Sequence, residues 1–483
     1  MLMTLIQKEI MHHILSARFV ALLLMCVLLI PLTFFISYRH HRQNQVDYQE
    51  AVKRASTEAK ENPPDAQDPD KEVSKLFLKP TPLSVFANGL EEALPTYLGM
   101  TRNGIRQSTT GLTQTPLSYA LGHLDFLFVV STVFSLLALL FTFDAVAGER
   151  ETGTIRLTLA NAIPRDRFLL GKLMGGYFVF VVPFLVSFLL GLLLLVWQGF
   201  PLGESAIFPR VVSLTLAALL YIAVFFAIGT VISTYFDNAK TALIVAFSIW
   251  VFAVLILPRV GFLTAKIIVP TRTEQSVYME KAALRNDLLK EKQEKINKKM
   301  LEALGVGQFT VTEGVQEKLA GLRAPVEEEY RQKFQNQADK IDREYQREQN
   351  RQEQLGETFS RITPTASLIY LAMNLAQTGK LKRDTYFQTG NRYYNQLDQD
   401  YFKDISDDAL AQMRHLTGRA MARMNPSAAS SKSEAEKIPP APDLTGASLK
   451  EALEYSMFDV LLLCVFAIVL TTVAFLKFFR LDV

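Results

Sequence analysis

Six long stretches of this chain contain no aspartate, glutamate, lysine or arginine. At a rise of about 1.5 Å per residue, roughly 17 to 25 apolar residues let a helix cross the hydrocarbon core of a membrane, where a helix satisfies its own backbone hydrogen bonds. One such stretch could be a buried helix of a soluble core, but six together exclude that alternative. We therefore expect six spanning helices, at residues 19–38, 126–143, 173–197, 211–236, 241–258 and 460–476.

The first stretch also has to be weighed as a cleaved signal peptide. It exceeds the usual apolar core of about 7 to 15 residues, and Ser37, Tyr38 and Arg39 offer no cleavage site of small residues. We expect it to remain as a spanning helix.

The composition agrees with a membrane protein and excludes several other classes. Of 483 residues, 49% are hydrophobic and only 20% are charged, whereas soluble domains carry about 25% charge. The formal net charge of +3 provides no basic field for nucleic acid, so no nucleic-acid partner is expected. Cys26 and Cys464 both lie inside apolar stretches, which excludes a disulfide framework or a thiolate metal site.

Basic residues in the short loops predict the orientation. Residues 145–172 carry five lysines and arginines, whereas the loop at 204–210 carries only Arg210. Because basic loops stay in the cytoplasm, the loop at 144–172, the start at 1–18 and the tail at 477–483 are expected inside. The segments 39–125 and 259–459 then lie outside the membrane on the other side.

The larger outer segment is expected to be helical. Its 30 basic and 29 acidic residues indicate a hydrated surface. Thr273–Leu304 and Glu313–Leu355 show apolar stripes at helical spacing around a turn at Gly305, and we expect these stripes to pack together in a hairpin or short coiled coil. The ranges 365–378 and 383–416 also look helical, whereas 58–71 and 425–446 have the composition of mobile linkers.

These features predict an all-α polytopic membrane protein, with six transmembrane helices and two extracytoplasmic, mainly helical insertions. No catalytic constellation is recognised in the sequence. Gly305 and Gly307 lack the third glycine of a dinucleotide fingerprint, and Gly171-Lys172 lacks the rest of a P-loop. The spans contain no ionisable side chain of the kind that proton relays and ion-coupled transporters use. Energy for transport would have to come from a partner.

The loop at 144–172 provides a contact surface for such a partner. Thr152 is expected to cap the N-terminus of a short helix, in which Ile155, Leu157 and Leu159 give apolar surface beside Arg156. A short helix of this kind can enter a groove of another protein. The alternative is a juxtamembrane loop whose arginines bind lipid headgroups.

A family resemblance favours the first alternative. Residues Glu149, Arg150, Glu151, Gly153, Thr154, Pro164, Arg165, Gly171 and Lys172 resemble the E-R-E-x-G-T, P-x-x-R and G-K signature of ABC-2 exporter permeases, with Arg165 here directly after Pro164. The amphipathic residues 1–18 resemble the elbow helix before the first span of that family. Residues 80–90 and 363–387 resemble elements of permeases with enlarged outer loops.

The resemblance implies the membrane-spanning subunit of an ATP-driven exporter in a bacterial inner membrane. Such a subunit is not an enzyme and holds no cofactor, because ATP and Mg are bound by cytosolic ABC ATPase subunits. Its other expected partners are a second permease copy or a sister permease, membrane lipid and an extracytoplasmic protein. The runner-up function is a membrane-anchored sensor or assembly factor. The implied ATPase-coupling residues are Glu149, Arg150, Glu151, Thr152, Gly153, Thr154, Ile155, Arg156, Leu157 and Arg165.

Overall fold

A computed structural model describes residues 2–61, 71–101, 104–108, 124–160, 164–304, 313–402, 438–444 and 446–480. The chain divides into two compact units. The first contains Met1–Pro258, Arg361–Asp398 and Ser431–Val483, and the second contains Arg259–Ser360 and Gln399–Ser430.

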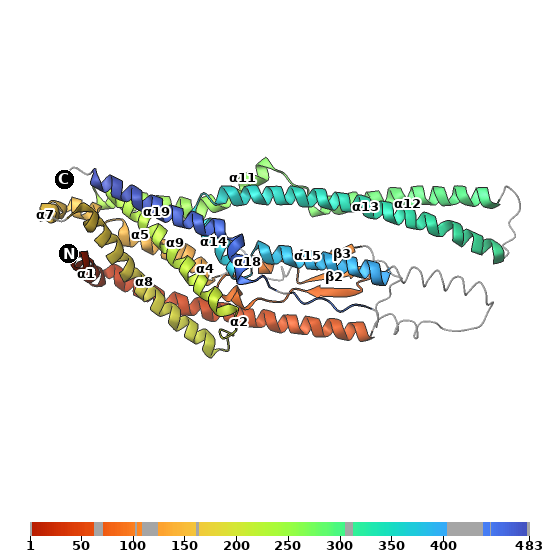
Figure 1. Ribbon diagram of the computed structural model, residues 1–483, viewed down its shortest axis with the longest axis horizontal. Coiled ribbons are helices and arrows are strands. Elements are labelled where there is room, and N and C mark those ends of the chain that lie inside the picture. Colours follow the sequence, from red (N-terminus) through yellow and green to blue (C-terminus); the bar gives the residue numbers. More distant parts are fainter. Residues whose placement is uncertain are drawn as a thin grey trace. The chain divides into compact units, whose positions relative to one another are not determined.

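Six helices of the described residues are long and apolar enough to cross a membrane. This result confirms the predicted all-α polytopic fold (Figure 1). The first span belongs to α2 (Ala17–Glu61), and the third, fourth and sixth are α8 (Arg165–Trp197), α9 (Ile207–Tyr235) and α19 (Met457–Phe479). The second consists of α4 (Phe126–Phe128), η3 (Val129–Phe134) and α5 (Ser135–Thr142), and the fifth of α10 (Ala239–Trp250), η4 (Val251–Ile256) and α11 (Leu257–Ile268).

The core of the first unit is a cluster of aromatic and aliphatic side chains between the spanning helices. Phe34 of α2 is fully buried and packs against Phe126 and Phe188 at centroid distances of 5.4 and 5.6 Å. Gly191 allows this approach, since a Cβ there would lie 2.6 Å from the Phe34 ring. Both η3 and η4 are π-helical, and next to them Trp250 Nε1 donates a hydrogen bond to Ser135 Oγ at 2.9 Å.

The helix α2 continues well beyond the predicted span. Pairs spaced by four residues, such as Arg54 with Glu50 at 3.0 Å, are the kind that stabilise a polar helix. The prediction of a mobile linker at 58–71 is therefore wrong for residues 58–61, which are helical, while residues 62–70 lie outside the described part.

The segment at 39–125 also holds a small sheet, which the sequence did not predict. Its strands β1 (Ser74–Phe77), β2 (Tyr97–Thr101) and β3 (Gly104–Gln107) are antiparallel in the order β1-β2-β3, with Phe77 opposite Tyr97. The short helices η1 (Pro82–Val85) and η2 (Glu91–Ala93) lie between β1 and β2 in the chain. Strands of four or five residues are too short to show a clear alternation in the sequence.

Helices from the segment at 259–459 also belong to this part of the first unit. In α15 (Lys380–Leu397), Tyr386 donates to the backbone oxygens of Leu76 and Pro95, at 3.1 and 3.3 Å. Burial of the hydroxyl raises the pKa of Tyr386. The apolar helix α14 (Pro364–Leu375) packs against α9 and α19. Arg361, just before α14 in the chain, forms an ion pair with Asp459 at 2.8 Å. The short helix α18 (Leu449–Tyr455) begins with a capping box formed by Ser448 and Glu451.

The second unit contains the predicted helical hairpin. Its helices are α12 (Glu274–Leu304) and α13 (Glu313–Ser360), and Leu288, Ile296, Val326 and Tyr330 form a buried cluster between them. The predicted packing is therefore confirmed, whereas the turn at Gly305 lies outside the described residues. In the predicted helix at 383–416, α15 is followed by η5 (Asp398–Phe402), and residues 403–416 are outside the described part. Of the predicted linker at 425–446, only 438–444 and 446 are described, and they form neither helix nor strand.

Candidate functional site

The loop between the second and third spans folds into two short helices, and the second of them contains Ile155, Leu157 and Leu159, as expected. These helices are α6 (Ala147–Glu151) and α7 (Thr154–Ala160). Gly153 separates them with a φ of 73°, a left-handed conformation that glycine adopts without strain. The expectation that Thr152 caps the following helix is wrong, because Thr152 ends α6 and its hydroxyl donates to Gly148 O at 3.0 Å.

Glu149 joins this loop to the N-terminal helix α1 (Leu2–Ile14) through Lys172. The Lys172 Nζ lies 2.7 Å from Glu149 Oε1 and 3.1 Å from Glu9 Oε1, and its side chain is only 9% exposed. His13 lies 3.5 Å from the same oxygen of Glu9. Burial by itself would raise the pKa of Glu9, but the hydrogen bond with His13 and the charge of Lys172 outweigh it and lower the pKa to about 2.

A close approach of two helix backbones makes this ion-pair chain possible. A Cβ at Gly171 would lie 3.2 Å from the Cβ of Leu5, and one at Gly175 would lie 2.8 Å from the Cβ of Glu9. The G-K pair of the signature therefore has a structural meaning. The glycine gives α1 room against α8, and the lysine bonds α1 to the loop.

Arg150 and Glu151 contact the junction between the fourth and fifth spans. Arg150 forms an ion pair with Asp237. The Glu151 carboxylate accepts a hydrogen bond from the backbone N–H of Ala239, at 3.0 Å, in the first turn of α10. A carboxylate at a helix N-terminus is favourable, because the first N–H groups of a helix have no partner within it.

Two further contacts hold the base of the loop, and the sequence analysis did not single out their residues. The hydroxyl of Ser233 in α9 accepts hydrogen bonds from the backbone N–H groups of Val146 and Ala147, at 2.8 and 3.0 Å. Arg18 donates to both carboxylate oxygens of Asp144, at 2.8 and 2.7 Å. Arg18 directly precedes the first apolar stretch and Asp144 directly follows the second, and these placements are the signal that could have suggested the pair.

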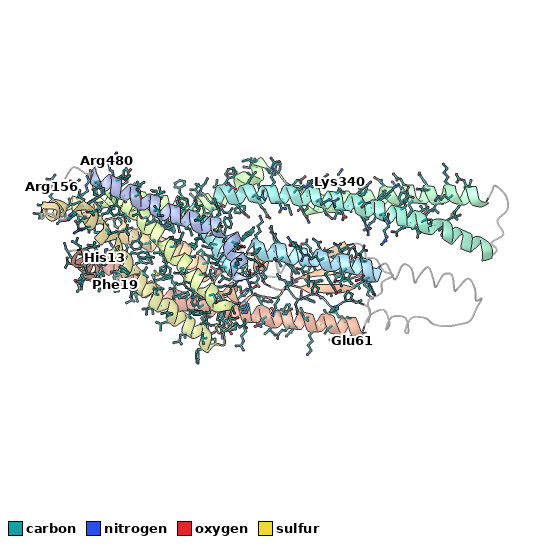
Figure 2. All side chains as sticks on the ribbon, in the orientation of Figure 1. His13, Phe19, Glu61, Arg156, Lys340 and Arg480 are labelled. Atoms are coloured by element: carbon teal, nitrogen blue, oxygen red, sulfur yellow. The ribbon has the colours of Figure 1, made fainter. Side chains whose placement is uncertain are left out.

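The helix α7 has a buried side and an exposed side. Ile155 is 3% exposed and belongs to a cluster with Phe168, Leu169 and Phe478. The hydroxyl of Thr154 donates to Glu149 O at 3.3 Å. Arg156 is exposed and Leu157 is 72% exposed. Figure 2 shows Arg156 at the same end of the first unit as His13 and Arg480.

The neighbouring Arg165 fixes the end of the sixth span. Its guanidinium donates to the backbone oxygen of Phe479, at 2.8 Å, where α19 ends. A cation at the C-terminus of a helix is favourable for its macrodipole.

The structure thus brings all ten predicted residues together but divides them by role. Five of them, Glu149, Arg150, Glu151, Ile155 and Arg165, contact α8, α10, α19 or the turn between α9 and α10. Thr152, Gly153 and Thr154 shape the loop itself, while the exposed side chains of Arg156 and Leu157 present a basic and an apolar group on α7. In the described residues, no group of three or more histidine, cysteine, aspartate or glutamate side chains could hold a metal ion. The arrangement is that of a fixed contact surface.

Comparisons with known proteins point to one class of membrane protein. A family model described as ABC-2 family transporter protein matches residues 3–483. A probable ABC transporter permease protein NosY of Pseudomonas aeruginosa is 32% identical over 154 residues, which cover 28% of this chain and 54% of that relative. A protein of the same description from Stutzerimonas stutzeri is 31% identical over 150 residues, covering 28% and 53%. The chain spans about half the length of the curated relatives it matches.

Proposed function

This chain belongs to the ABC-2 family of transporter proteins and is an ABC transporter membrane subunit, and we propose that it couples ATP hydrolysis in a separate cytosolic subunit to the export of a substrate. In this proposal the chain itself is not catalytic. The ATP and Mg are bound by the partner ATPase, and a second permease copy or a sister permease completes the pathway through the membrane, which is a bacterial inner membrane.

The observation that carries the proposal is the set of contacts that hold the loop at 144–172, which contains α6 and α7. Charged and polar contacts join it to α1 through Glu149 and Lys172, to α9 through Ser233, and to α19 through Arg165. A force on α7 therefore acts on several spans together, because packed helices move as rigid elements. A loop that only bound lipid headgroups would not require such attachments.

The proposed docking surface is the exposed side of α7. Leu157 offers an apolar anchor and Arg156 a charge beside it, a combination that suits a groove in a partner protein. In this orientation the loop and both ends of the chain lie in the cytoplasm, as the excess of basic residues at 145–172 predicts.

The test is copurification of the full chain with its ATPase subunit in detergent. Leu157→Asp with Arg156→Glu should weaken the association at least about thirtyfold, since loss of a central interface anchor costs about 2 kcal/mol or more. Lys8→Glu changes an exposed charge on α1 and is the matched control, expected to bind normally. An ATPase that binds the double variant as tightly as the parent would refute the docking surface.

The orientation is tested separately by thiol labelling. Cys26 and Cys464 are replaced by alanine, and Leu157→Cys is treated with a reagent that does not cross membranes. The thiol should react only after the cells are opened. Reaction in intact cells would place the loop outside and overturn the proposed coupling to a cytosolic ATPase.

A further inference from the structure

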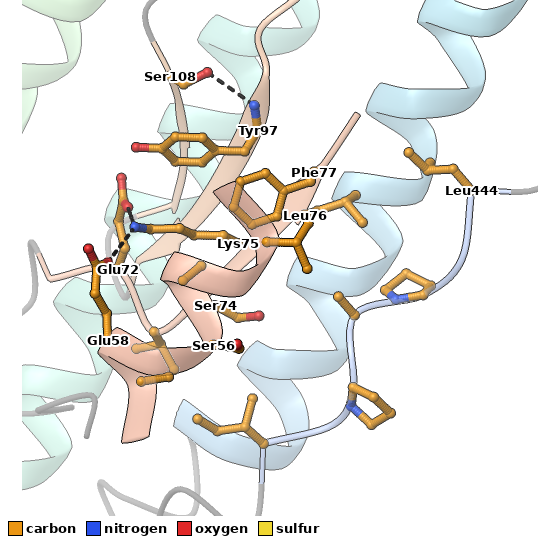
Figure 3. Close-up of a pocket in the computed structure, with 18 of the residues that line it drawn as sticks. Ser56, Glu58, Glu72, Ser74, Lys75, Leu76, Phe77, Tyr97, Ser108 and Leu444 are labelled. Atoms are coloured by element: carbon orange, nitrogen blue, oxygen red, sulfur yellow. Dashed lines mark hydrogen bonds and ion pairs between the residues drawn. The ribbon is translucent and has the colours of Figure 1, made fainter. Parts of the chain in front are cut away.

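The first unit contains a large cleft at the C-terminal end of α2. It has a volume of about 1330 Å³ and lies between the last turns of α2, the small sheet and the segment Ile438–Leu444 (Figure 3). Small-molecule pockets usually measure about 300 to 1,000 Å³. The cleft is therefore large enough for a longer ligand.

One wall of the cleft carries a row of aromatic rings from three elements. Tyr48 of α2 and Phe77 of β1 have ring centroids 6.5 Å apart, and Phe77 and Tyr97 of β2 are 5.4 Å apart. All three side chains line the cleft, and both strand residues are only partly buried. Aromatic faces of this kind bind apolar groups and proline rings.

The described residues that line the cleft carry four cations and three carboxylates, an excess of one cation. Lys75 pairs with two of the carboxylates, those of Glu58 and Glu72, each at 3.6 Å, and its ammonium group lies 5.2 Å from the centre of the Tyr97 ring. Lys71, Lys79 and Arg106 also line the cleft and are exposed, and within the described ranges none of the three forms an ion pair with a carboxylate. The remaining acidic group of the lining is Asp443.

The opposite wall is itself an extended polypeptide segment. Ile438–Leu444 has three prolines, and the backbone oxygen of Pro439 accepts a hydrogen bond from Tyr393 at 2.8 Å. The Tyr393 oxygen also lies 2.8 Å from Ser74 Oγ of β1. The cleft thus already accommodates extended backbone along one side, next to the sheet.

We propose that this cleft binds an extended acidic segment of another polypeptide, with apolar or proline side chains against Tyr48, Phe77 and Tyr97, and with carboxylates near Lys71, Lys79 and Arg106. The inference uses the proposed function for one point only, which is the side of the membrane on which the cleft meets its partner. A small anion would contact the cations but not the aromatic rings, and an uncharged peptide would contact only the rings. An acidic peptide with apolar residues contacts both.

The experiment uses the full chain, purified in detergent without an ATPase, so its result does not depend on coupling. The protein is incubated with an array of short random peptides. The bound set should be enriched in peptides that combine aspartate or glutamate with apolar residues or proline. Lys79→Glu with Arg106→Glu should reduce binding of that set about tenfold or more, because two attractive charge contacts become repulsive.

The matched control reverses two exposed lysines outside the cleft, with Lys53→Glu and Lys298→Glu. Both double variants change the net charge equally, so only the cleft variant should lose binding. Three results would overturn the proposal: no acidic enrichment, equal loss in both double variants, or acidic enrichment without apolar preference that inorganic phosphate abolishes. The thermal unfolding of each variant is measured to verify that it is folded.

Discussion

The ion pairs between α1 and the loop at 144–172, which carries the family signature and is called the signature loop below, make the sharpest prediction. Replacing Glu9 by glutamine keeps the shape of the side chain but removes its charge. The parent carboxylate is 12% exposed and bonds Lys172 at 3.1 Å. We expect Glu9→Gln to weaken the attachment of α1 to α8, while the spanning helices stay folded.

The magnitude follows from the pKa of Glu9. Lowering it from 4.5 to about 2 corresponds to about 3 kcal/mol, since each pH unit is worth about 1.4 kcal/mol. Because the pKa is lowered in the folded state, this stabilisation is complete above about pH 4.5 and is lost as the pH falls toward 2. The Glu9→Gln variant lacks this stabilisation at neutral pH. The opening of its α1 should therefore depend less on pH between about 2 and 4.5 than the opening in the parent.

The assay measures local opening through a buried thiol. Ile6 is 8% exposed, and Ile6→Cys in a background without Cys26 and Cys464 reacts only when α1 opens. The reagent is 4,4′-dipyridyl disulfide, which still reacts with thiols in acid, and each rate is divided by that of the unfolded protein at the same pH. Glu9→Gln should raise the labelling rate by about tenfold to a hundredfold at neutral pH, because part of the lowered pKa comes from His13, which lies on α1 itself. Gln7→Ala, on the exposed side of the same helix, is the control. Equal labelling of parent and Glu9→Gln, or the same pH dependence between about 2 and 4.5, would refute the reasoning.

Two other predictions concern the packing of the spans. Arg361→Met leaves the Asp459 carboxylate, 1% exposed, without this partner, and should lower the free energy of unfolding in detergent by about 3 to 5 kcal/mol. Chemical denaturation measures this loss, and Asp459→Asn added to the variant should restore part of it, whereas no recovery would argue against a charge effect. A Cβ at position 175 would lie only 2.8 Å from the Cβ of Glu9. Gly175→Val adds a branched side chain there, so it should push α1 away from α8 and raise labelling of the thiol at position 6. Gly203→Ala, which meets no atom within 4 Å, should not, and an unchanged rate in Gly175→Val would contradict the close helix contact.

The sequence allowed the spanning helices to be predicted because their physical signal is strong. A charge-free stretch of membrane length leaves few alternatives, and the hairpin of α12 and α13 has a regular apolar stripe, as at Leu288 and Ile296. The sheet was missed because β1 and β3 have four residues each. The polar end of α2 was missed because its composition resembles that of a linker, while pairs such as Arg54 with Glu50 stabilise it locally.

The signature loop was located from the sequence, but the roles of its residues were not. A motif shows which residue types occur together, and it does not show which side chains face inward. In the sequence, Glu149 and Glu151 look like residues that contact a partner protein. In the structure, Lys172 forms an ion pair with Glu149, and the backbone N–H of Ala239 donates a hydrogen bond to Glu151. Only the tertiary contacts reveal that Leu157 is exposed while Ile155, two residues earlier, is buried.

The unbroken helix α2 joins the two sites of this protein mechanically. Its 45 residues extend over about 68 Å. Arg18, near its start, is bound to Asp144, and Tyr48 and Glu58, which line the cleft, lie about 45 and 60 Å further along the helix. Figure 1 shows this helix running from the spanning helices to the side of the sheet. A rod of this length turns small tilts at one end into larger displacements at the other, unless it bends at Pro31. Whatever fills the cleft therefore acts through α2 on the loop at 144–172, and a displacement of that loop acts through α2 on the cleft.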